Sequence, residues 1–433
     1  MNQKQFLRLG LFQLAAGGLS VLFLGVLNRV MRVELGMDLL TVSILVGGGH
    51  YLGALVAIPF GYYSDRRSIA GYRRTVYILL GSLITALILV SSPWIAQWIA
   101  ASPTAFRIGT GFLFFLMEGI STFVAGTAYL ALITDLTDRE ERGRVTSWIW
   151  TLLMVGIIFT GVLSGFVLEP FRLARVVTLF VIGAGTAVFL ALLALWRQEK
   201  PFQGKLELES GSLKQAFRGI LSNPPARWFG AFLFLSMFSY FMQDVILEPF
   251  GGEVFGLTAS ATTRFNAYMG IGVVSGMLSG GMLLIPRRGK PWTTSLGVMI
   301  MILSFGGLAL SSLTSSAAVL PFVILALGLG SGFFTVGGVS MMMDMTSAAQ
   351  AGLFVGVWTL IQAAAKGPTA IVGGAIQTGL ISLGLTPGGA YAGVFLIEAL
   401  GLLISLVFLR QVAVEDFQKE AANFEQAAAD SLV

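Results

Sequence analysis

Four ionisable residues of this 433-residue chain fall near the middle of long apolar stretches, where a side chain could do chemistry away from water: His50, Glu118, Lys366 and Glu398. A charge at the centre of a bilayer costs at least about 2.5–3.5 kcal/mol on insertion scales, so each one needs a partner or a function. The neutral imidazole of His50 can bind a metal ion, carry a proton, or make a structural hydrogen bond. The residue type alone leaves these alternatives open.

Glu118 and Lys366 carry opposite charges at a similar depth in their stretches. They can neutralise each other as a structural pair, bind a polar substrate, or carry a proton. For Glu398 the alternatives are a protonated carboxyl, a local pair, or a contact with a partner protein.

Two further polar clusters lie toward the ends of apolar stretches. Arg29 and Arg32 are within helical reach of Glu34, so the sequence predicts that these charges screen one another. A second cluster lies in the seventh stretch and consists of Gln243, Asp244 and Glu248.

The composition identifies a membrane protein. Hydrophobic residues make up 55% of the chain and charged residues only 11%, whereas soluble domains average about 25% charged. This excludes a water-soluble enzyme, a DNA-binding domain and a disordered chain. The absence of cysteine and the single histidine exclude disulfides, thiol catalysis and metal sites with several histidines. With no catalytic or phosphate-binding signature either, we expect no enzyme and no resident metal site.

The elements that must position these residues are membrane-spanning helices, which need about 20 apolar residues each. Twelve stretches satisfy this length: 7–33, 38–64, 73–100, 104–134, 145–168, 172–196, 227–252, 258–286, 291–313, 317–343, 349–379 and 388–410. The sequence therefore predicts an all-α membrane protein with 12 transmembrane helices in two pseudo-symmetric six-helix bundles.

Basic residues give the orientation. If the N-terminus is cytoplasmic, twenty of the 27 lysines and arginines fall on the cytoplasmic side, as the positive-inside rule requires. Both termini are then cytoplasmic, and the basic net charge of +5 reflects topology and not nucleic-acid binding.

The longest polar stretch divides the chain into halves. We predict an N-terminal bundle (1–196), a cytoplasmic linker with an amphipathic helix (197–226), a C-terminal bundle (227–410) and a cytoplasmic tail (411–433). Asp135 is followed eight residues later by Gly143, and Asp344 by Gly352 in the second half, which indicates an internal repeat. Glycines four residues apart predict close helix seams; they are Gly161 and Gly165, and Gly272, Gly276 and Gly280.

The loop after the second stretch resembles the signature of the major facilitator superfamily. Its residues are Gly61, Asp65, Arg66, Gly71, Arg73 and Arg74. The resemblance implies a cytoplasmic latch between helices, with Glu140, Arg142 and Arg144 as partners. The alternative is an ordinary solvated basic loop.

Three further motifs stand in the first half: Asn28-Arg29-Val30-Met31 with Val33-Glu34-Leu35-Gly36, Gly71-Tyr72-Arg73-Arg74, and Glu141-Arg142-Gly143-Arg144-Val145. Together they resemble the PucC/LhaA family, the bacteriochlorophyll delivery branch of that superfamily. The resemblance implies a protein of a photosynthetic membrane that binds or passes chlorophyll or bacteriochlorophyll during assembly of light-harvesting or photosystem complexes. The partners it implies are the lipid bilayer, subunits of those complexes, and chlorophyll synthase.

Candidate residues follow for each hypothesis. For a pigment, His50 can supply an axial nitrogen to the chlorin magnesium, and Asn28, Arg29 and Glu34 form a second candidate site. The alternative hypothesis is a proton-coupled small-solute transporter that uses Glu118, Lys366, Asp244, Glu248 and Gln243. A scaffold that assists assembly without transport is the third hypothesis.

Overall fold

The computed structural model describes residues 3–55, 69, 71–72, 74–137, 139–199, 224–344 and 351–412. Within these ranges every regular element is a helix, apart from one isolated β-bridge between Ile69 and Tyr72. This agrees with the all-α class predicted from the apolar stretches.

The first half of the chain forms long helices, several of which contain π-helical turns. The first span combines an α-helix with two π-helical segments, and the second starts with a short α-helix and another π-helical segment. The elements are α1 (Gln3–Ser20), η1 (Val21–Leu27), η2 (Val30–Glu34), α2 (Leu39–Val42), η3 (Ser43–Gly48), α4 (Thr75–Ala101), α5 (Ala105–Leu136), α6 (Arg139–Val167) and α7 (Leu173–Leu195).

The second half repeats this organisation. Its first span is broken by a 3-10 turn and its second ends in a π-helical segment. The elements are α9 (Pro224–Phe241), η4 (Met242–Val245), α10 (Leu247–Phe255), α11 (Ala259–Ser279), η5 (Gly280–Leu284), α12 (Ile285–Arg288), α13 (Lys290–Thr314), η6 (Ala317–Val319), α14 (Leu320–Asp344), α15 (Ala351–Ser382) and α16 (Pro387–Leu409).

All twelve predicted stretches contain a helix. Among the described residues, nine helices are long and apolar enough to cross a membrane, and α9 with η4 and α10 gives a tenth that is bent by 47°. The other two stretches hold the shorter apolar helix Leu39–Leu55 and the 32-residue α15. The division into domains stays a prediction, because residues 200–223 of the linker lie outside the described ranges; α9 already begins at Pro224.

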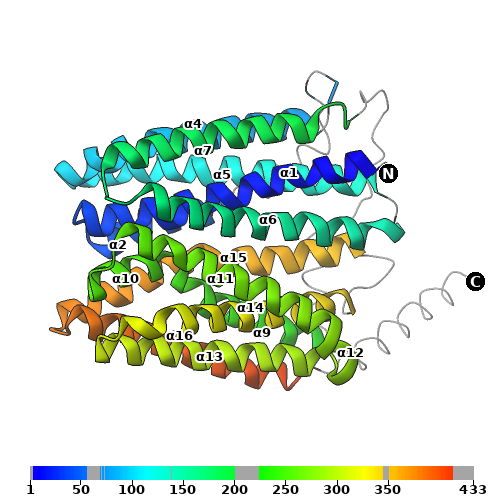
Figure 1. Cartoon of the computed structure of the whole chain (residues 1–433). Helices are drawn as coiled ribbons and strands as arrows, with labels where there is room; N and C mark the ends of the chain where they lie inside the picture. Colours follow the sequence, from blue (N-terminus) through cyan, green and yellow to red (C-terminus); the bar gives the residue numbers. More distant parts are fainter. Residues whose placement is uncertain are drawn as a thin grey trace, which may run out of the picture.

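The helices lie side by side in one elongated bundle (Figure 1). Contacts connect the helices of the first half with one another, for example α1 with α6 and α7, and α4 with α5 and α7. Contacts likewise connect the helices of the second half, for example α14 with α11 and α13, and α16 with α9 and α13. The two halves meet where α6 contacts α11 and where α15 contacts α2 and η3. The N-terminus and the end of α16 lie at the same end of the bundle. We call the opposite end, which the basic residues predict to be extracytoplasmic, the outer end.

The glycine seams predicted from sequence are confirmed. A Cβ atom on Gly272 or Gly276 would meet backbone atoms of α14, and a Cβ on Gly161 or Gly165 would meet α11. Lipid tails are as apolar as the helices, so close backbone approach and van der Waals contact stabilise such pairs.

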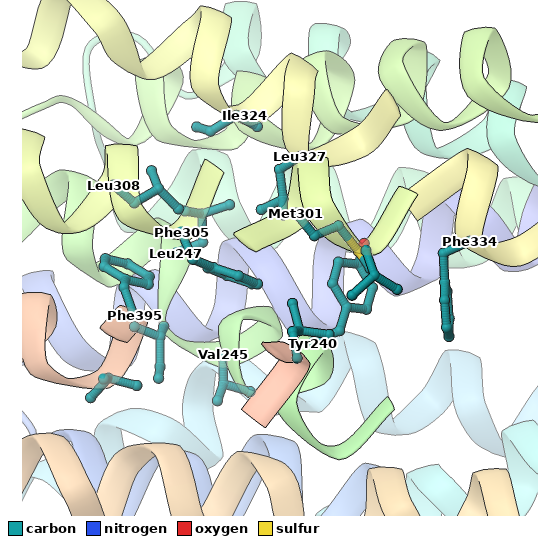
Figure 2. Packing of buried hydrophobic residues seen from close by; sticks show 14 of the residues in the cluster. Tyr240, Val245, Leu247, Met301, Phe305, Leu308, Ile324, Leu327, Phe334 and Phe395 are labelled. Atoms are coloured by element: carbon teal, nitrogen blue, oxygen red, sulfur yellow. The ribbon is translucent and has the colours of Figure 1, made fainter. Parts of the chain in front are cut away.

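Between the helices of the second half lies a core of aromatic and aliphatic side chains (Figure 2). Phe395 of α16 contacts Phe250 of α10 edge-to-face at 5.0 Å between ring centroids, and stacks with Phe305 of α13 at 6.3 Å. This packing holds the bent seventh span against spans 9 and 12, and so fixes the position of the polar residues that η4 carries.

Candidate functional site

A buried hydrogen-bonded pair joins the second and fourth spans. The Nδ1 atom of His50 lies 2.7 Å from Oε2 of Glu118, and the two residues are only 7% and 3% exposed. The other carboxylate oxygen of Glu118 accepts a hydrogen bond of 2.9 Å from the hydroxyl of Thr122. The hypothesis that Glu118 pairs with Lys366 is therefore wrong, since His50 occupies the carboxylate.

Glycines bring His50 and Glu118 together. A Cβ on Gly49 would lie 2.9 Å from the Cβ of Phe115, and a Cβ on Gly53 or Gly119 would clash with the backbone of the facing helix. Span 2 therefore approaches α5 closely enough for a short imidazole–carboxylate contact. The facing helix therefore fills the space beside Gly49 and Gly53.

Three aromatic rings surround the imidazole. The ring centroids of Tyr51, Phe123 and Phe23 lie 5.1, 5.2 and 5.8 Å from that of His50. Because Nδ1 faces a carboxylate, Nε2 is the nitrogen available to a metal or a proton. A carboxylate on one ring nitrogen orients a histidine for metal binding at the other.

A second, half-buried cluster surrounds Asp244 in η4. The hydroxyl of Tyr51 donates to Oδ2 of Asp244, and the side-chain amide of Gln243 donates to Oδ1 at 2.6 Å. The ammonium group of Lys366 lies 3.8 Å from the centre of the Phe241 ring and interacts electrostatically with Asp244. Asp244, and not Glu118, is therefore the acid whose charge acts on Lys366.

Glu398 is fully buried, and neither of its carboxylate oxygens has a hydrogen bond of ordinary geometry among the described residues. The backbone of Gln243 is near enough to act on the carboxyl as a hydrogen-bond donor, and the charge of Asp244 also acts on it. Of the alternatives for Glu398, this arrangement disfavours both the local ion pair and exposure to a partner protein.

At the outer end, the first span binds the seventh. Arg29 pairs with Glu34 at 2.5 Å, as the sequence predicts, and also donates to the carbonyl of Leu257 at 2.9 Å. The buried side chain of Asn28 donates to the carbonyl of Val245 at 2.6 Å. Two of the candidate pigment ligands therefore also bridge the halves.

Arg32 corrects a second prediction, since its partner is Glu253 and not Glu34. Its Nε and Nη2 atoms donate to the two oxygens of Glu253 at 2.9 and 2.6 Å, and the hydroxyl of Tyr391 donates to the same carboxylate at 2.8 Å. We had placed the end of the seventh span at residue 252, so Glu253 was missed as an outer loop residue. Because only 11% of the residues are charged, an acidic residue at the end of a span is rare enough to be considered as a partner for a nearby arginine.

Glu248 also belongs to this outer cluster. It accepts hydrogen bonds from Asn266 at 2.5 Å and Thr263 at 3.4 Å, and it interacts electrostatically with Arg29. A Cβ on Gly25 would clash with its carboxylate, so that glycine leaves room for the acid.

The predicted latch is described only in part. Gly61, Asp65, Arg66 and Arg73, and the side chains of Glu140, Arg142 and Arg144, lie outside the described residues. The backbone at Gly71 has φ +81°, which favours glycine. Arg74 pairs with Asp135 at 3.2 Å, and Glu199 accepts a hydrogen bond of 2.7 Å from the backbone N–H of Thr75. Within the described residues, the predicted latch is therefore represented by the ion pair between Arg74 and Asp135.

With this geometry in hand, comparison with known proteins identifies the family. The family model described as "PUCC protein" matches residues 26–417. The chain belongs to the PUCC family. It is 30% identical to a "Protein PucC" of Rhodobacter capsulatus, over 93% of this chain and 91% of that protein. It is 32% identical to the "Bacteriochlorophyll synthase 44.5 kDa chain" of the same species, over 93% of each.

Solved structures show the same fold. A D-xylose–proton symporter has a TM-score of 0.72 at 13% identity and covers 95% of this PUCC-family chain and 98% of its own. The nucleoside transporter NupG has a TM-score of 0.68 at 18% identity, with 95% and 99% covered. These likenesses confirm the major facilitator fold. They concern the fold alone, so the polar contacts described above are properties of this chain and are not transferred from those structures.

Proposed function

We propose that this chain handles (bacterio)chlorophyll while light-harvesting or photosystem complexes are assembled in a photosynthetic membrane. The observation that carries the proposal is the match to the PUCC family over residues 26–417. The name of the bacteriochlorophyll synthase chain, which is similar along nearly its whole length, supports a pigment as cargo.

His50 is the first candidate ligand. In a chlorin, four ring nitrogens already hold the magnesium, so a single axial donor such as Nε2 is enough. Glu118 orients the imidazole through Nδ1. Phe23, Tyr51 and Phe123 surround the ring and would be the aromatic neighbours of a chlorin held at Nε2. Glu34, which pairs with Arg29 at the outer end, is the second candidate.

The test is the visible absorbance of the tagged protein after mild purification from a phototrophic host. We expect a stoichiometric chlorin band that His50→Ala removes and Glu118→Gln weakens. If the band survives in His50→Ala, the protein still binds pigment, and Glu34 becomes the candidate ligand. A colourless wild-type protein that retains its fold overturns pigment binding.

Partners are tested in the same preparation. We propose antenna or photosystem subunits and chlorophyll synthase as partners, and a pull-down should recover them together with pigment. Recovery of these subunits without pigment would favour the scaffold hypothesis.

A second candidate, proton-coupled transport of a small solute, is supported by the buried pair His50 and Glu118 and by the half-buried Asp244 and Lys366. Solute uptake into vesicles that stops when an uncoupler is added, by a protein that carries no pigment, would replace the first proposal with this one.

A further inference from the structure

Arg264 is a cation on a membrane-spanning helix with no acid paired to it in the described part of the chain. It lies on α11, five residues after the helix begins at Ala259, or about 7.5 Å inside the outer end. Its guanidinium donates to the hydroxyl of Ser260 on the same helix at 3.3 Å. The ion pairs among the described residues join other groups, and Glu169, the exposed acid that follows α6, is not in any of them. A guanidinium stays charged in proteins, so an anion from outside the chain can compensate it.

The side chain of Arg264 crosses the seam between the two halves. Its guanidinium carbon lies 5.4 Å from the centre of the Phe166 ring on α6. A Cβ on Gly165 would lie 3.0 Å from Cγ and Nε of Arg264, so this glycine leaves the space that the arginine occupies. Helices α6 and α11 lie side by side and form one of the contacts between the halves (Figure 1). Arg264 therefore belongs to the second half and packs on the first.

The surface of the seam next to the guanidinium is apolar. On α6, Phe166 and Phe159 are 68% and 64% exposed, and Val162 between them is also exposed. On α11, the exposed Ile271 follows Arg264 by seven residues, about two turns, and so lies on the same face. Seven residues of helix span about 10 Å, which fits within the hydrocarbon of one leaflet, about 15 Å. A fixed positive charge at the outer end of an exposed apolar strip suits an amphiphile with an anionic head and an apolar chain.

We propose that the outer part of the seam between α6 and α11 binds an anionic phospholipid of the surrounding bilayer. Its phosphate pairs with Arg264, whose planar guanidinium presents N–H donors in a fork that matches phosphate oxygens. One acyl chain lies along Phe166, Val162 and Phe159. Because residues of both halves form the site, the bound lipid stabilises the arrangement in which α6 and α11 are in contact. The proposal does not depend on pigment handling, since the bilayer supplies the lipid whatever the cargo is.

A lipid suits the site better than a soluble anion does. Inorganic phosphate would use the charge of Arg264 and leave the apolar strip uncovered, whereas a phospholipid covers both. A long cationic side chain on a span directs its charged end toward the membrane interface. The hydrogen bond to Ser260, one turn nearer the beginning of α11, shows that Arg264 does so. The phosphate groups of the outer leaflet lie at that interface.

Native mass spectrometry of the full chain in mild detergent tests the proposal. The probes are phosphatidylglycerol, an anionic phospholipid, and a diacylglycerol with the same chains and no phosphate. The parent should bind one phosphatidylglycerol about 10- to 100-fold more tightly than the diacylglycerol, as expected for hydrogen bonds to a charged group. Arg264→Gln should bind the two lipids alike. Arg264→Lys keeps the charge but not the fork, so its preference should be intermediate.

Arg107→Gln is the matched control. The Arg107 guanidinium lies 5.1 Å from the Trp98 ring near the outer end of α5, much as Arg264 lies over Phe166. It already donates to the carbonyl of Trp98 at 2.7 Å, and its helix packs on α4 within the first half. This variant should keep the full preference. Phosphatidylglycerol should also raise the melting temperature of the parent and of Arg107→Gln, but not that of Arg264→Gln.

Four results overturn the inference. The parent could bind both lipids alike, or Arg107→Gln could lose as much affinity as Arg264→Gln, which would indicate a general effect of surface charge. Inorganic phosphate at the same concentration could displace the lipid, which would assign Arg264 to a soluble anion. A polypeptide could occupy the seam in the protein extracted from membranes and exclude phosphatidylglycerol. If Arg264→Gln fails to fold, as judged by gel filtration, the two lipids compared on the parent and on Arg264→Lys decide.

Discussion

Arg32 and Glu253 should hold the outer end closed between the first and seventh spans. Their side chains are 15% and 22% exposed, and two hydrogen bonds of 2.9 and 2.6 Å join them. Hydrogen bonds that involve charged groups contribute about 1.5–3 kcal/mol. Arg32→Ala leaves Glu253 with the hydroxyl of Tyr391. We expect the closed arrangement to lose about 2 kcal/mol, which is about a 30-fold change in the ratio of closed to open.

The assay is the distance between spin labels on Ala105→Cys and Ala318→Cys in liposomes at constant pH. The chain has no cysteine of its own, and these two residues are exposed at the outer ends of α5 and η6, one in each half. Arg32→Lys keeps the charge but not the paired geometry, so it should open the outer end to an intermediate extent. Combining Arg32→Glu with Glu253→Arg should restore closure, and the double-mutant cycle gives the coupling between the two residues.

The reasoning is refuted if Arg32→Ala and Glu253→Gln leave the distance distribution unchanged. It is also refuted if the reversed pair opens the outer end as much as the two single reversals added together. Either result would mean that the contacts of Arg29 and Asn28 close this end without Arg32.

Three further predictions concern stability, measured as the melting temperature of the purified protein. Gly119→Ala places a Cβ against the backbone of His50 and should destabilise the fold by about 1–3 kcal/mol. Gly126→Ala is the control, because a Cβ there meets nothing within 4 Å and should not destabilise the fold. Equal shifts in melting temperature for the two variants would contradict this prediction. Glu398→Leu replaces a buried carboxyl that has no hydrogen bond of ordinary geometry within the described part of the chain, and should leave stability unchanged or raise it. A marked fall in melting temperature would show that the contact with the Gln243 backbone stabilises the fold. Arg8→Ala removes hydrogen bonds of 2.7 and 2.6 Å to the carbonyls of Leu193 and Trp196 at the end of α7, and should cost about 1 kcal/mol; no change would mean that water replaces them.

Much of the fold was predictable from one-dimensional signals. Apolar runs of about 20 residues predicted the spans, because a segment that crosses the lipid must form its backbone hydrogen bonds internally, as a helix does. Glycines four residues apart, such as Gly272 and Gly276, gave the seam between α11 and α14. Arg29 and Glu34 were expected to pair because they are close in sequence on one span, although it is the π-helical turn of η2 that brings residues five apart onto the same face.

The partners across helices were not predictable in the same way. Glu118 and Lys366 were expected to meet because they lie at a similar depth, yet Glu118 binds His50, and Lys366 lies near Asp244. Depth along a span says nothing about the direction in which a side chain points. The π-helical turns of η1, η2 and η3 shift that direction further, and periodicity calculated for an ideal helix does not include such shifts.

The sequence by itself determined that this chain is a helical membrane protein of the PUCC type and which few ionisable residues it buries, because hydropathy and residue identity are properties of the chain. Only the tertiary structure decided that His50 binds one half and Tyr51 the other, and that Arg32 reaches Glu253, 221 residues away. The physical reason is that glycine-mediated approach and helix rotation set which side chains meet. In a membrane interior each buried charge must then find its counter-charge among the groups that packing brings near.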